Sequence, residues 1–335
     1  MKRYLILACV LASATALATV PSTVAKEEAS RPPPCQEEST QRMIKINGDD
    51  LRGILSLEPE AGSGPMLNWV KLKQAQLDNA PLKGLRLDGG TLRTPTRSPE
   101  KLVGAVLQGV DGNGQPVDVA VCGATPAEDD PKTVSYQIKV WNSKSGTWQN
   151  PCTPTYEVQS PQVLAVRGVW DDSGARRKDY DRFTFACETG VIGKCILAGY
   201  KPWGKKGRYS LEDLHQACTR MMRADYCGDG RSHTRPGTTV EIQDDAGVLL
   251  ATKGLSERDA PFEAVWTPNG AWCMASTRGG ETLETIVDQC PGVFVTATAN
   301  PGQGERCAVQ RKGKRPSTPL LHSHRIVQHE SARAE

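Results

Sequence analysis

The stretch Val134-Ser135-Tyr136-Gln137-Ile138-Lys139-Val140 decides the fold class of this chain. Apolar and polar side chains alternate along it, and a period of two is typical of a strand that buries one face. Turn-forming residues follow from Asn142 to Gly146, before Thr147-Trp148 resumes the pattern. The stretch therefore predicts an antiparallel sheet with one face in a core.

Further short strands are predicted on both sides of that stretch. They lie at Met43–Ile46, Leu51–Leu57, Leu102–Gln108, Val117–Cys122, Val163–Trp170 and Phe183–Cys187. Turn residues separate them, including Asn47-Gly48, which favours a hairpin. Short strands at this spacing are typical of sandwiches and barrels. We expect a mainly β (α+β) protein whose residues 43–180 form an antiparallel β-sandwich or a barrel-like domain.

The last third of the chain repeats this pattern around one short helix. Hairpins are expected from Thr238–Gln243 with Val248–Ala251 and from Phe262–Trp266 with Ala271–Ala275. A short helix is expected at Glu281–Val287, and Phe294–Ala299 is expected to be the last strand.

Residues 210–226 predict the clearest helix. Ser210 is the expected N-cap, with Asp213 three residues on as a variant of the capping box. One apolar face recurs at helical spacing and comprises Leu211, Leu214, Cys218, Met221 and Met222. Because Gly228 and Gly230 follow, we expect the helix to end near Ala224–Tyr226.

The first 25 residues have the pattern of a secretory signal peptide. A basic start, Met1-Lys2-Arg3, precedes a short apolar run, and small residues allow cleavage after Ala18 or Ala25. The alternatives are a membrane anchor, which needs about 20 predominantly apolar residues, and a lipoprotein processed at Cys9. Polar residues crowd the second half of the segment and favour the signal peptide. We expect an exported protein of the periplasm, cell surface or extracellular space, with no membrane span after cleavage and a Pro-rich linker at 26–42.

Ten cysteines remain after removal of the leader, and an even number in an oxidising compartment predicts disulfides. They are Cys35, Cys122, Cys152, Cys187, Cys195, Cys218, Cys227, Cys273, Cys290 and Cys307. Their density favours a cysteine-rich module at 181–307, stapled by disulfides. One hypothesis pairs Cys218 with Cys227, which requires the chain to fold back after the helix because disulfide-linked Cα atoms lie within about 7 Å.

Charge gives little indication of a partner. The 41 Lys and Arg nearly balance the 38 Asp and Glu, for a net charge of +3, so a nucleic-acid partner is not expected. Residues 308–335 are basic and lack apolar periodicity, which predicts a disordered tail. His322, His324 and His329 lie in it and suggest weak metal binding at most.

The segment from Phe183 to Gly230 resembles a known family. It contains Phe183-Thr184-Phe185-Ala186-Cys187, Gly193-Lys194-Cys195, Gly199-Tyr200-Lys201-Pro202-Trp203-Gly204, His215-Gln216-Ala217-Cys218-Thr219-Arg220-Met221 and Arg223-Ala224-Asp225-Tyr226-Cys227-Gly228-Asp229-Gly230. This combination is similar to the ADYC domain, a family of exported bacterial proteins with a characteristic Ala-Asp-Tyr-Cys tetrapeptide. The resemblance implies export and paired cysteines, but no activity and no catalytic residue.

Two metal sites have to be weighed against simpler structural roles. His215, Cys218, Cys227 and His233 could bind zinc, but disulfides and packing account for them better in an exported protein. Asp225 and Asp229 could bind calcium, although Asp in such a loop more often stabilises a turn.

These residues define the alternative to a binding protein. A calcium- or zinc-dependent hydrolase would centre on His215, Asp225 and Asp229, the only catalytic candidates.

Tyr200, Lys201 and Trp203 are the candidate binding residues. Aromatic rings beside polar groups in a loop suit the recognition of carbohydrate or protein at the cell surface. The alternative, which is the commoner role of such residues, is that Tyr200 and Trp203 cover the helix and bury a disulfide. The leading interpretation is a non-enzymatic binding or structural module that requires no cofactor.

Overall fold

The computed structural model describes residues 31–35, 51–52, 67–235, 237–297 and 306–327. The predicted signal peptide, most of the predicted linker and nearly all of the hairpin predicted at 43–57 lie outside these ranges. Within them, no helix has the length and apolar character needed to cross a membrane.

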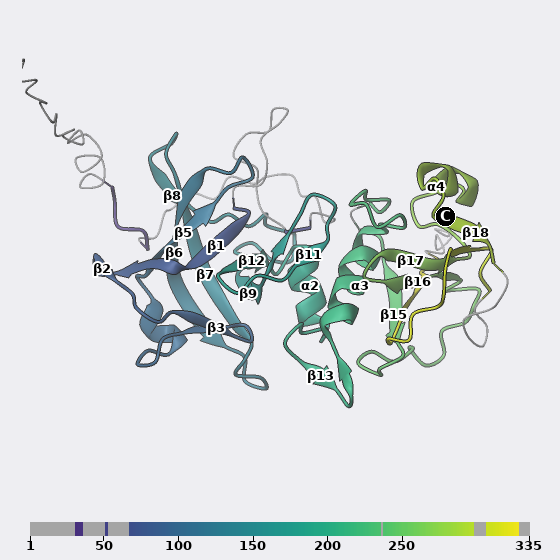
Figure 1. The fold of residues 1–335 in the computed structure, drawn as a ribbon, viewed down its shortest axis with the longest axis horizontal. Coiled ribbons are helices and arrows are strands. Elements are labelled where there is room, and N and C mark those ends of the chain that lie inside the picture. Colours follow the sequence, from purple (N-terminus) through teal and green to yellow (C-terminus); the bar gives the residue numbers. More distant parts are fainter. Residues whose placement is uncertain (1–30, 36–50, 53–66, 236, 298–305, 328–335) are drawn as a thin grey trace, which may run out of the picture. The chain divides into compact units, whose positions relative to one another are not determined.

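Six antiparallel strands close into a barrel (Figure 1). In barrel order they are β1 (Trp69–Leu77), β5 (Val106–Val110), β6 (Pro116–Pro126), β7 (Val134–Asn142), β9 (Val163–Arg167) and β12 (Arg182–Cys187). β12 pairs back onto β1 through Val70 and Phe183, which closes the ring. Two short strands, β2 (Ala80–Pro81) and β8 (Thr147–Gln149), extend it. The mainly β fold is confirmed, and the N-terminal part is a barrel.

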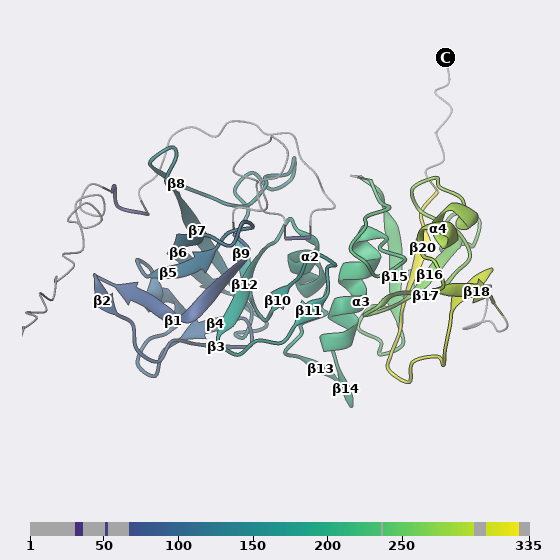
Figure 2. The same ribbon diagram turned by 45° about the horizontal axis from the view of Figure 1, so that its top comes forward.

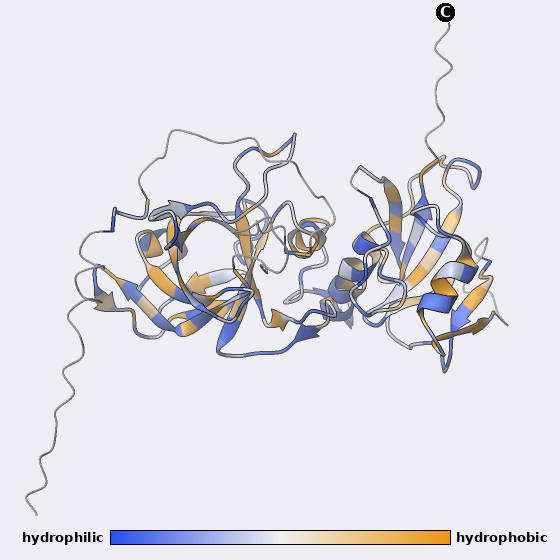
Figure 3. Cartoon of the chain, turned by 90° about the horizontal axis from the view of Figure 1, so that it is seen from above, coloured by the Kyte–Doolittle hydropathy of each residue, from blue (hydrophilic) through white to orange (hydrophobic). Residues whose placement is uncertain are grey.

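Alternation along the strands fills the interior of the barrel, as the banding in Figure 3 illustrates. On β7, Val134, Tyr136, Ile138 and Val140 are all buried, as predicted. The Tyr136 ring packs edge-on to Phe185, and its hydroxyl accepts a hydrogen bond from the Leu92 amide at 2.7 Å. That bond ties the barrel to the small hairpin of β3 (Arg86–Asp88) and β4 (Thr91–Arg93), which the 3-10 helix η1 (Pro99–Leu102) follows.

Two helices follow the barrel. α2 (Val191–Leu197) and α3 (Glu212–Arg223) pack against each other. Between them lies a hairpin of β13 (Lys205–Lys206) and β14 (Tyr209–Ser210), and before β12 a hairpin of β10 (Val169–Trp170) and β11 (Arg176–Arg177). The predicted capping box of α3 is wrong, because the N-cap is Leu211; the Ser210 hydroxyl accepts only from the Glu212 amide, at 3.3 Å. The predicted end is confirmed, since Ala224 adopts a left-handed conformation with φ 51°.

A second antiparallel sheet of six strands forms the C-terminal part (Figure 2). Its order is β15 (Val240–Asp244), β20 (Leu321–Arg325), β16 (Phe262–Thr267), β17 (Gly270–Met274), β19 (Val309–Arg311) and β18 (Phe294–Thr296). α3 packs on β16, β17 and β20, and its Leu214 and Met221 join Trp266 in one core. The predicted helix near 281–287 is α4 (Leu283–Gln289).

The structure corrects the predicted C-terminal end. The expected disordered tail at 308–335 supplies β19 and β20, the latter inside the sheet between β15 and β16. β20 therefore replaces the predicted partner of β15, residues 248–251. His322 and His324, assigned to that tail, belong to β20; His322 is buried beside Asp245 at 2.9 Å, so the tail interpretation is wrong for both. The polar sequence around β20 predicted disorder, but β20 is buried by its neighbouring strands β15 and β16, which the local sequence does not reveal.

The barrel extends past the predicted domain boundary at residues 180/181. β12, which completes it, comes after that boundary. The other proposed boundaries remain predictions.

All ten cysteines from Cys35 to Cys307 are paired. The disulfides are Cys35–Cys122, Cys152–Cys187, Cys195–Cys218, Cys227–Cys290 and Cys273–Cys307. The hypothesis of a Cys218–Cys227 bond is wrong, because Cys218 on α3 pairs with Cys195 on the adjacent α2. Five disulfides indicate an oxidising environment for the folded chain.

Candidate functional site

A pocket of about 200 Å³ lies where the barrel and α3 meet the connection from α2. It is lined by Gly89, Arg167, Arg176, Lys178, Asp179, Tyr180, Pro202, Trp203 and Glu212. The Trp203 indole lies against the turn between β3 and β4, where a Cβ on Gly89 or Gly90 would stand only 3.0–3.1 Å from the ring. Glycine at both positions therefore lets the ring fit at this wall.

An ion-pair cluster holds the polar wall of the pocket. Glu212, in the first turn of α3, accepts from Arg176 at 2.6 Å and pairs with Lys178 at 3.0 Å. Arg176 also donates to the Arg167 carbonyl at 2.7 and 3.0 Å, and its guanidinium stands 5.6 Å from the Trp170 ring. Each of the three guanidinium nitrogens donates one hydrogen bond, which fixes Arg176 in the wall.

The outer wall of the pocket is aromatic. Tyr180 is 79% exposed, and the Arg167 guanidinium lies 5.9 Å from its ring. Asp179 beside it pairs with Arg182 at 2.7 Å; burial alone would raise the pKa of this carboxyl, but hydrogen bonds from Arg182 and two backbone amides hold it below its usual value. The pocket thus combines two aromatic side chains with three cations and two carboxylates, most of them held in ion pairs.

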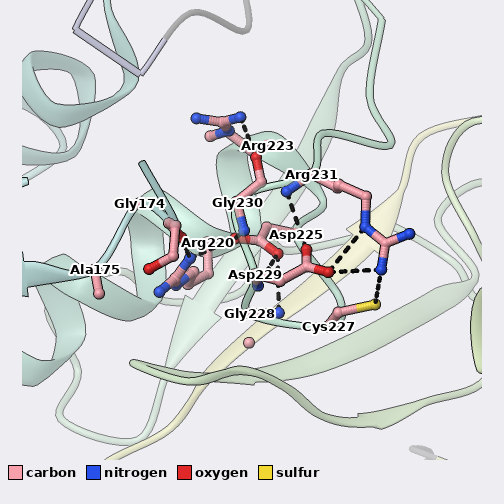
Figure 4. A network of polar contacts seen from close by, with 12 residues as sticks. Gly174, Ala175, Arg220, Arg223, Asp225, Cys227, Gly228, Asp229, Gly230 and Arg231 are labelled. Atoms are coloured by element: carbon pink, nitrogen blue, oxygen red, sulfur yellow. Dashed lines mark hydrogen bonds and ion pairs between the residues drawn. The ribbon is translucent and has the colours of Figure 1, made fainter. Parts of the chain in front are cut away.

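A second polar assembly surrounds the end of α3 (Figure 4). The left-handed Ala224 turns the chain so that the Asp225 carboxylate points back into the loop that follows. It accepts from the amides of Gly228, Asp229 and Gly230 at 2.9, 3.1 and 3.0 Å. Arg220 completes the set at 2.5 Å, and both side chains are at most 4% exposed. The lone pairs of Asp225 are fully used, which suits a buried charge.

Arg220 connects this loop to two other parts of the fold. Its guanidinium donates to the Ser173 carbonyl in the turn between β10 and β11, and to the Pro268 carbonyl between β16 and β17 at 3.1 Å. The turn before β11 lies beside the barrel, and the other belongs to the second sheet. One ion pair therefore joins three segments distant in sequence.

Tyr226 extends the assembly into the core of the second sheet. Its hydroxyl donates to Glu263 at 2.8 Å and accepts from the Arg278 amide at 2.8 Å. Glu263 is fully buried and also accepts from the Arg278 guanidinium at 2.8 Å and from Ser323 at 3.0 Å. Burial, with the Glu263 charge beside it, raises the pKa of the Tyr226 phenol well above its ordinary value, so it stays a hydrogen-bond donor.

Close backbone contacts complete this joint between the sheets. A Cβ on Gly228 would lie 1.9 Å from the Asn269 carbonyl, and one on Gly230 would lie 2.6 Å from that of Asp172. Both glycines have positive φ, 78° and 93°. Cys227, directly before Gly228, is bonded to Cys290 at the end of α4. We call residues 220–230 with these partners the motif joint.

The sequence around this joint matches a described family. The family model of the ADYC domain covers residues 99–280, more than half of the chain. The chain belongs to the ADYC domain family. No curated protein and no solved structure matches it. The ADYC tetrapeptide itself is Ala224–Cys227, in which all four residues have a structural role.

His215 lies in the core of the ADYC domain. It is fully buried against the Trp170 ring, and its Nε2 lies 3.2 Å from the Ile192 carbonyl oxygen. Burial lowers the pKa of His215 to about 3, so the ring is neutral at physiological pH. In this position, a substrate in solution cannot reach the His215 ring.

The other metal and catalytic candidates are also engaged. Asp229 pairs with Arg231 at 2.6 Å; burial would raise its pKa, but the hydrogen bonds from Arg231 keep it below the usual value. The zinc hypothesis is wrong, because Cys218 and Cys227 are in disulfides. Among the described residues, no group of three or more His, Cys, Asp or Glu is arranged to hold a metal.

The three predicted binding residues of the ADYC domain have different positions. Trp203 lines the pocket, whereas Tyr200 is fully buried and donates to Asp244 at 3.0 Å. Lys201 pairs with Asp130 at 2.8 Å and does not line the pocket. The sequence reasoning missed Tyr180 and the ion pairs of Glu212, although an aromatic residue after the charged run Arg176–Asp179 was a usable signal.

Proposed function

We propose that this ADYC domain protein is an exported, non-enzymatic binding protein that holds a saccharide in the pocket beside α3. One observation carries the proposal: the pocket places the exposed ring of Tyr180 and the Trp203 indole beside charged groups already held by ion pairs. Sugar rings combine apolar faces with many hydroxyls, and a wall of aromatic and charged groups complements both.

The state of the hydrolase candidates supports a binding role. A general base must reach the proton that it abstracts. His215 is buried with its pKa lowered to about 3, and Asp225 already accepts four hydrogen bonds. Both arrangements stabilise the fold and keep His215 and Asp225 from acting as an accessible base.

The five disulfides and the N-terminal sequence support export. Met1-Lys2-Arg3 and the apolar run after it have the features of a cleaved leader. Cell fractionation with alkylation before and after reduction tests this part: we expect a shortened chain outside the cytoplasm with no free thiol. A full-length, reduced chain in the cytoplasm would contradict it.

A glycan array with the oxidised full chain tests the binding proposal. We expect at least one class of saccharide to bind, and Tyr180→Ala to weaken that binding about tenfold. Tyr156→Ala is the matched control, because Tyr156 is 92% exposed and does not line the pocket. Equal signals for both variants, or no saccharide bound by the wild type, would contradict the proposal.

A further inference from the structure

The hairpin of β13 and β14 lies next to the pocket, between two of its lining residues in the sequence. Trp203 precedes it and Glu212 follows it, and both line the pocket. At its base Leu211 donates to the Gly204 carbonyl at 3.1 Å, while Lys205 pairs with Ser210 and Lys206 with Tyr209. Gly207, with φ 55°, forms the tip. The hairpin is therefore an anchored extension of the pocket rim.

The charges on this hairpin are not balanced. Lys205, Lys206 and Arg208 are exposed, and within the described ranges no carboxylate forms an ion pair with them. Arg208 lies 4.9 Å from the Tyr209 ring and donates to its hydroxyl at 2.8 Å, which orients the guanidinium. Lys178 at the pocket has a side chain that is 70% exposed and shares the Glu212 carboxylate with Arg176.

The charged side chains of the pocket, by contrast, are mostly held in ion pairs. Glu212 is shared by Arg176 and Lys178, and Asp179 pairs with Arg182. The inner site therefore presents aromatic rings and ion-paired side chains with a small excess of positive charge, and the adjacent hairpin presents positive charge that no ion pair in the described part of the chain compensates. A ligand that fits both has a ring for the pocket and anionic groups spaced along a chain beyond it.

We propose that the ligand is an acidic polysaccharide, one unit of which enters the pocket while its carboxylates lie along the β13–β14 hairpin. This inference rests on the proposed function and specifies its ligand class. Lysine and arginine attract the chain from solution, and the pocket selects the sugar ring over other polyanions.

Calorimetry with three polymers tests the ligand class: polygalacturonate, the same polymer with its carboxyls methyl-esterified, and inorganic polyphosphate. We expect polygalacturonate to bind, the ester to bind at least about tenfold more weakly, and the affinity for polygalacturonate to fall as salt rises. Equal binding of the ester would overturn the acidic ligand while leaving saccharide binding intact. No binding of polygalacturonate would also overturn this inference. The proposed function would then still be tested independently by the glycan array.

Two pairs of variants test the location. We expect Lys205→Gln/Lys206→Gln and Tyr180→Ala each to weaken polygalacturonate binding about tenfold. The controls Lys312→Gln/Lys314→Gln and Tyr156→Ala remove the same groups from exposed positions outside the pocket, and we expect them to stay within about twofold. Polyphosphate that binds as tightly as polygalacturonate and is insensitive to Tyr180→Ala would reduce the site to a general cation patch and overturn the proposal.

Discussion

The motif joint and the pocket rim use the same residue types in opposite ways. In the joint, Arg220 and Asp225 are buried; the carboxylate accepts four hydrogen bonds, and the guanidinium donates to it and to two backbone carbonyls. At the rim, Lys205 and Lys206 are exposed and have no carboxylate partner among the described residues. A saturated, buried network stabilises a fold, whereas exposed, uncompensated charge is available to a ligand.

This comparison separates the family signature from the candidate binding surface. The tetrapeptide Ala224–Cys227 reverses the chain, neutralises Arg220, supports Glu263 and forms a disulfide. Each role connects segments of the fold. In this chain, the signature of the ADYC domain therefore marks residues that hold the fold together.

The largest effect is expected from Asp225→Asn. The change leaves Arg220 buried with an uncompensated charge, which costs about 3–5 kcal/mol of unfolding free energy. Asp229→Asn is the matched control, because Asp229 is 41% exposed and its pairing with Arg231 should contribute less than about 1 kcal/mol. Urea unfolding of the oxidised proteins measures both. Equal losses of unfolding free energy in the two variants would contradict the different roles assigned to the buried and the exposed ion pair.

Gly228→Ala should cause the second-largest loss of unfolding free energy. Its Cβ would overlap the Asn269 carbonyl, in addition to the strain of a positive φ. Gly207→Ala controls for the strain alone, since Gly207 also has a positive φ but nothing within 4 Å of the added Cβ. We expect Gly228→Ala to cost at least about 2 kcal/mol more in chemical unfolding. A difference near zero would show that the close approach is dispensable.

Tyr226→Phe should cost about 1–3 kcal/mol, because it deprives the Arg278 amide and one Glu263 oxygen of a buried partner. The thermal midpoint of unfolding measures it. An unchanged midpoint would contradict the role assigned to the phenol.

His215 should give the smallest effect at neutral pH and a growing effect in acid. Its pKa is about 3 in the folded chain and about 6.5 when unfolded, so unfolding takes up a proton between these values. The contribution of His215 to the free energy of unfolding is present above pH 6.5. It is lost as the pH falls, by up to about 1.4 kcal/mol per pH unit. Wild-type unfolding takes up about one more proton than unfolding of His215→Phe in this range. Between pH 6 and 4, the slope of unfolding free energy against pH should therefore be smaller in the variant by about 1.4 kcal/mol per pH unit. An identical slope would contradict the burial of a neutral ring.

Local pattern predicted those elements whose burial is regular. The alternation in Val134–Val140 is uninterrupted, and the β7 strand forms as expected. β1 was not predicted, because its register shifts between Val70 and Ala75 and the period of two is broken. β20 was missed because its burial comes from β15 and β16, which lie far away in the sequence.

The candidate site was predictable only in part. Trp203 was identified from its loop, but Tyr180 and Glu212 reach the same pocket from separate segments. Disulfide pairing is equally non-local: Cys227 bonds to Cys290 across 63 residues. Glu263 carried a local signal, a carboxylate inside the apolar run Phe262–Trp266, whose meaning depends on Arg278 and Tyr226.

Two tyrosines allow the most direct test of the division between joint and rim. Thermal unfolding and polygalacturonate affinity are measured on Tyr226→Phe and Tyr180→Ala, with affinity determined well below both midpoints. The account predicts that Tyr226→Phe lowers the midpoint and keeps the affinity, while Tyr180→Ala keeps the midpoint and loses about tenfold in affinity. A Tyr226→Phe protein that stays folded and loses the ligand, beside a Tyr180→Ala protein that still binds it, would contradict the account.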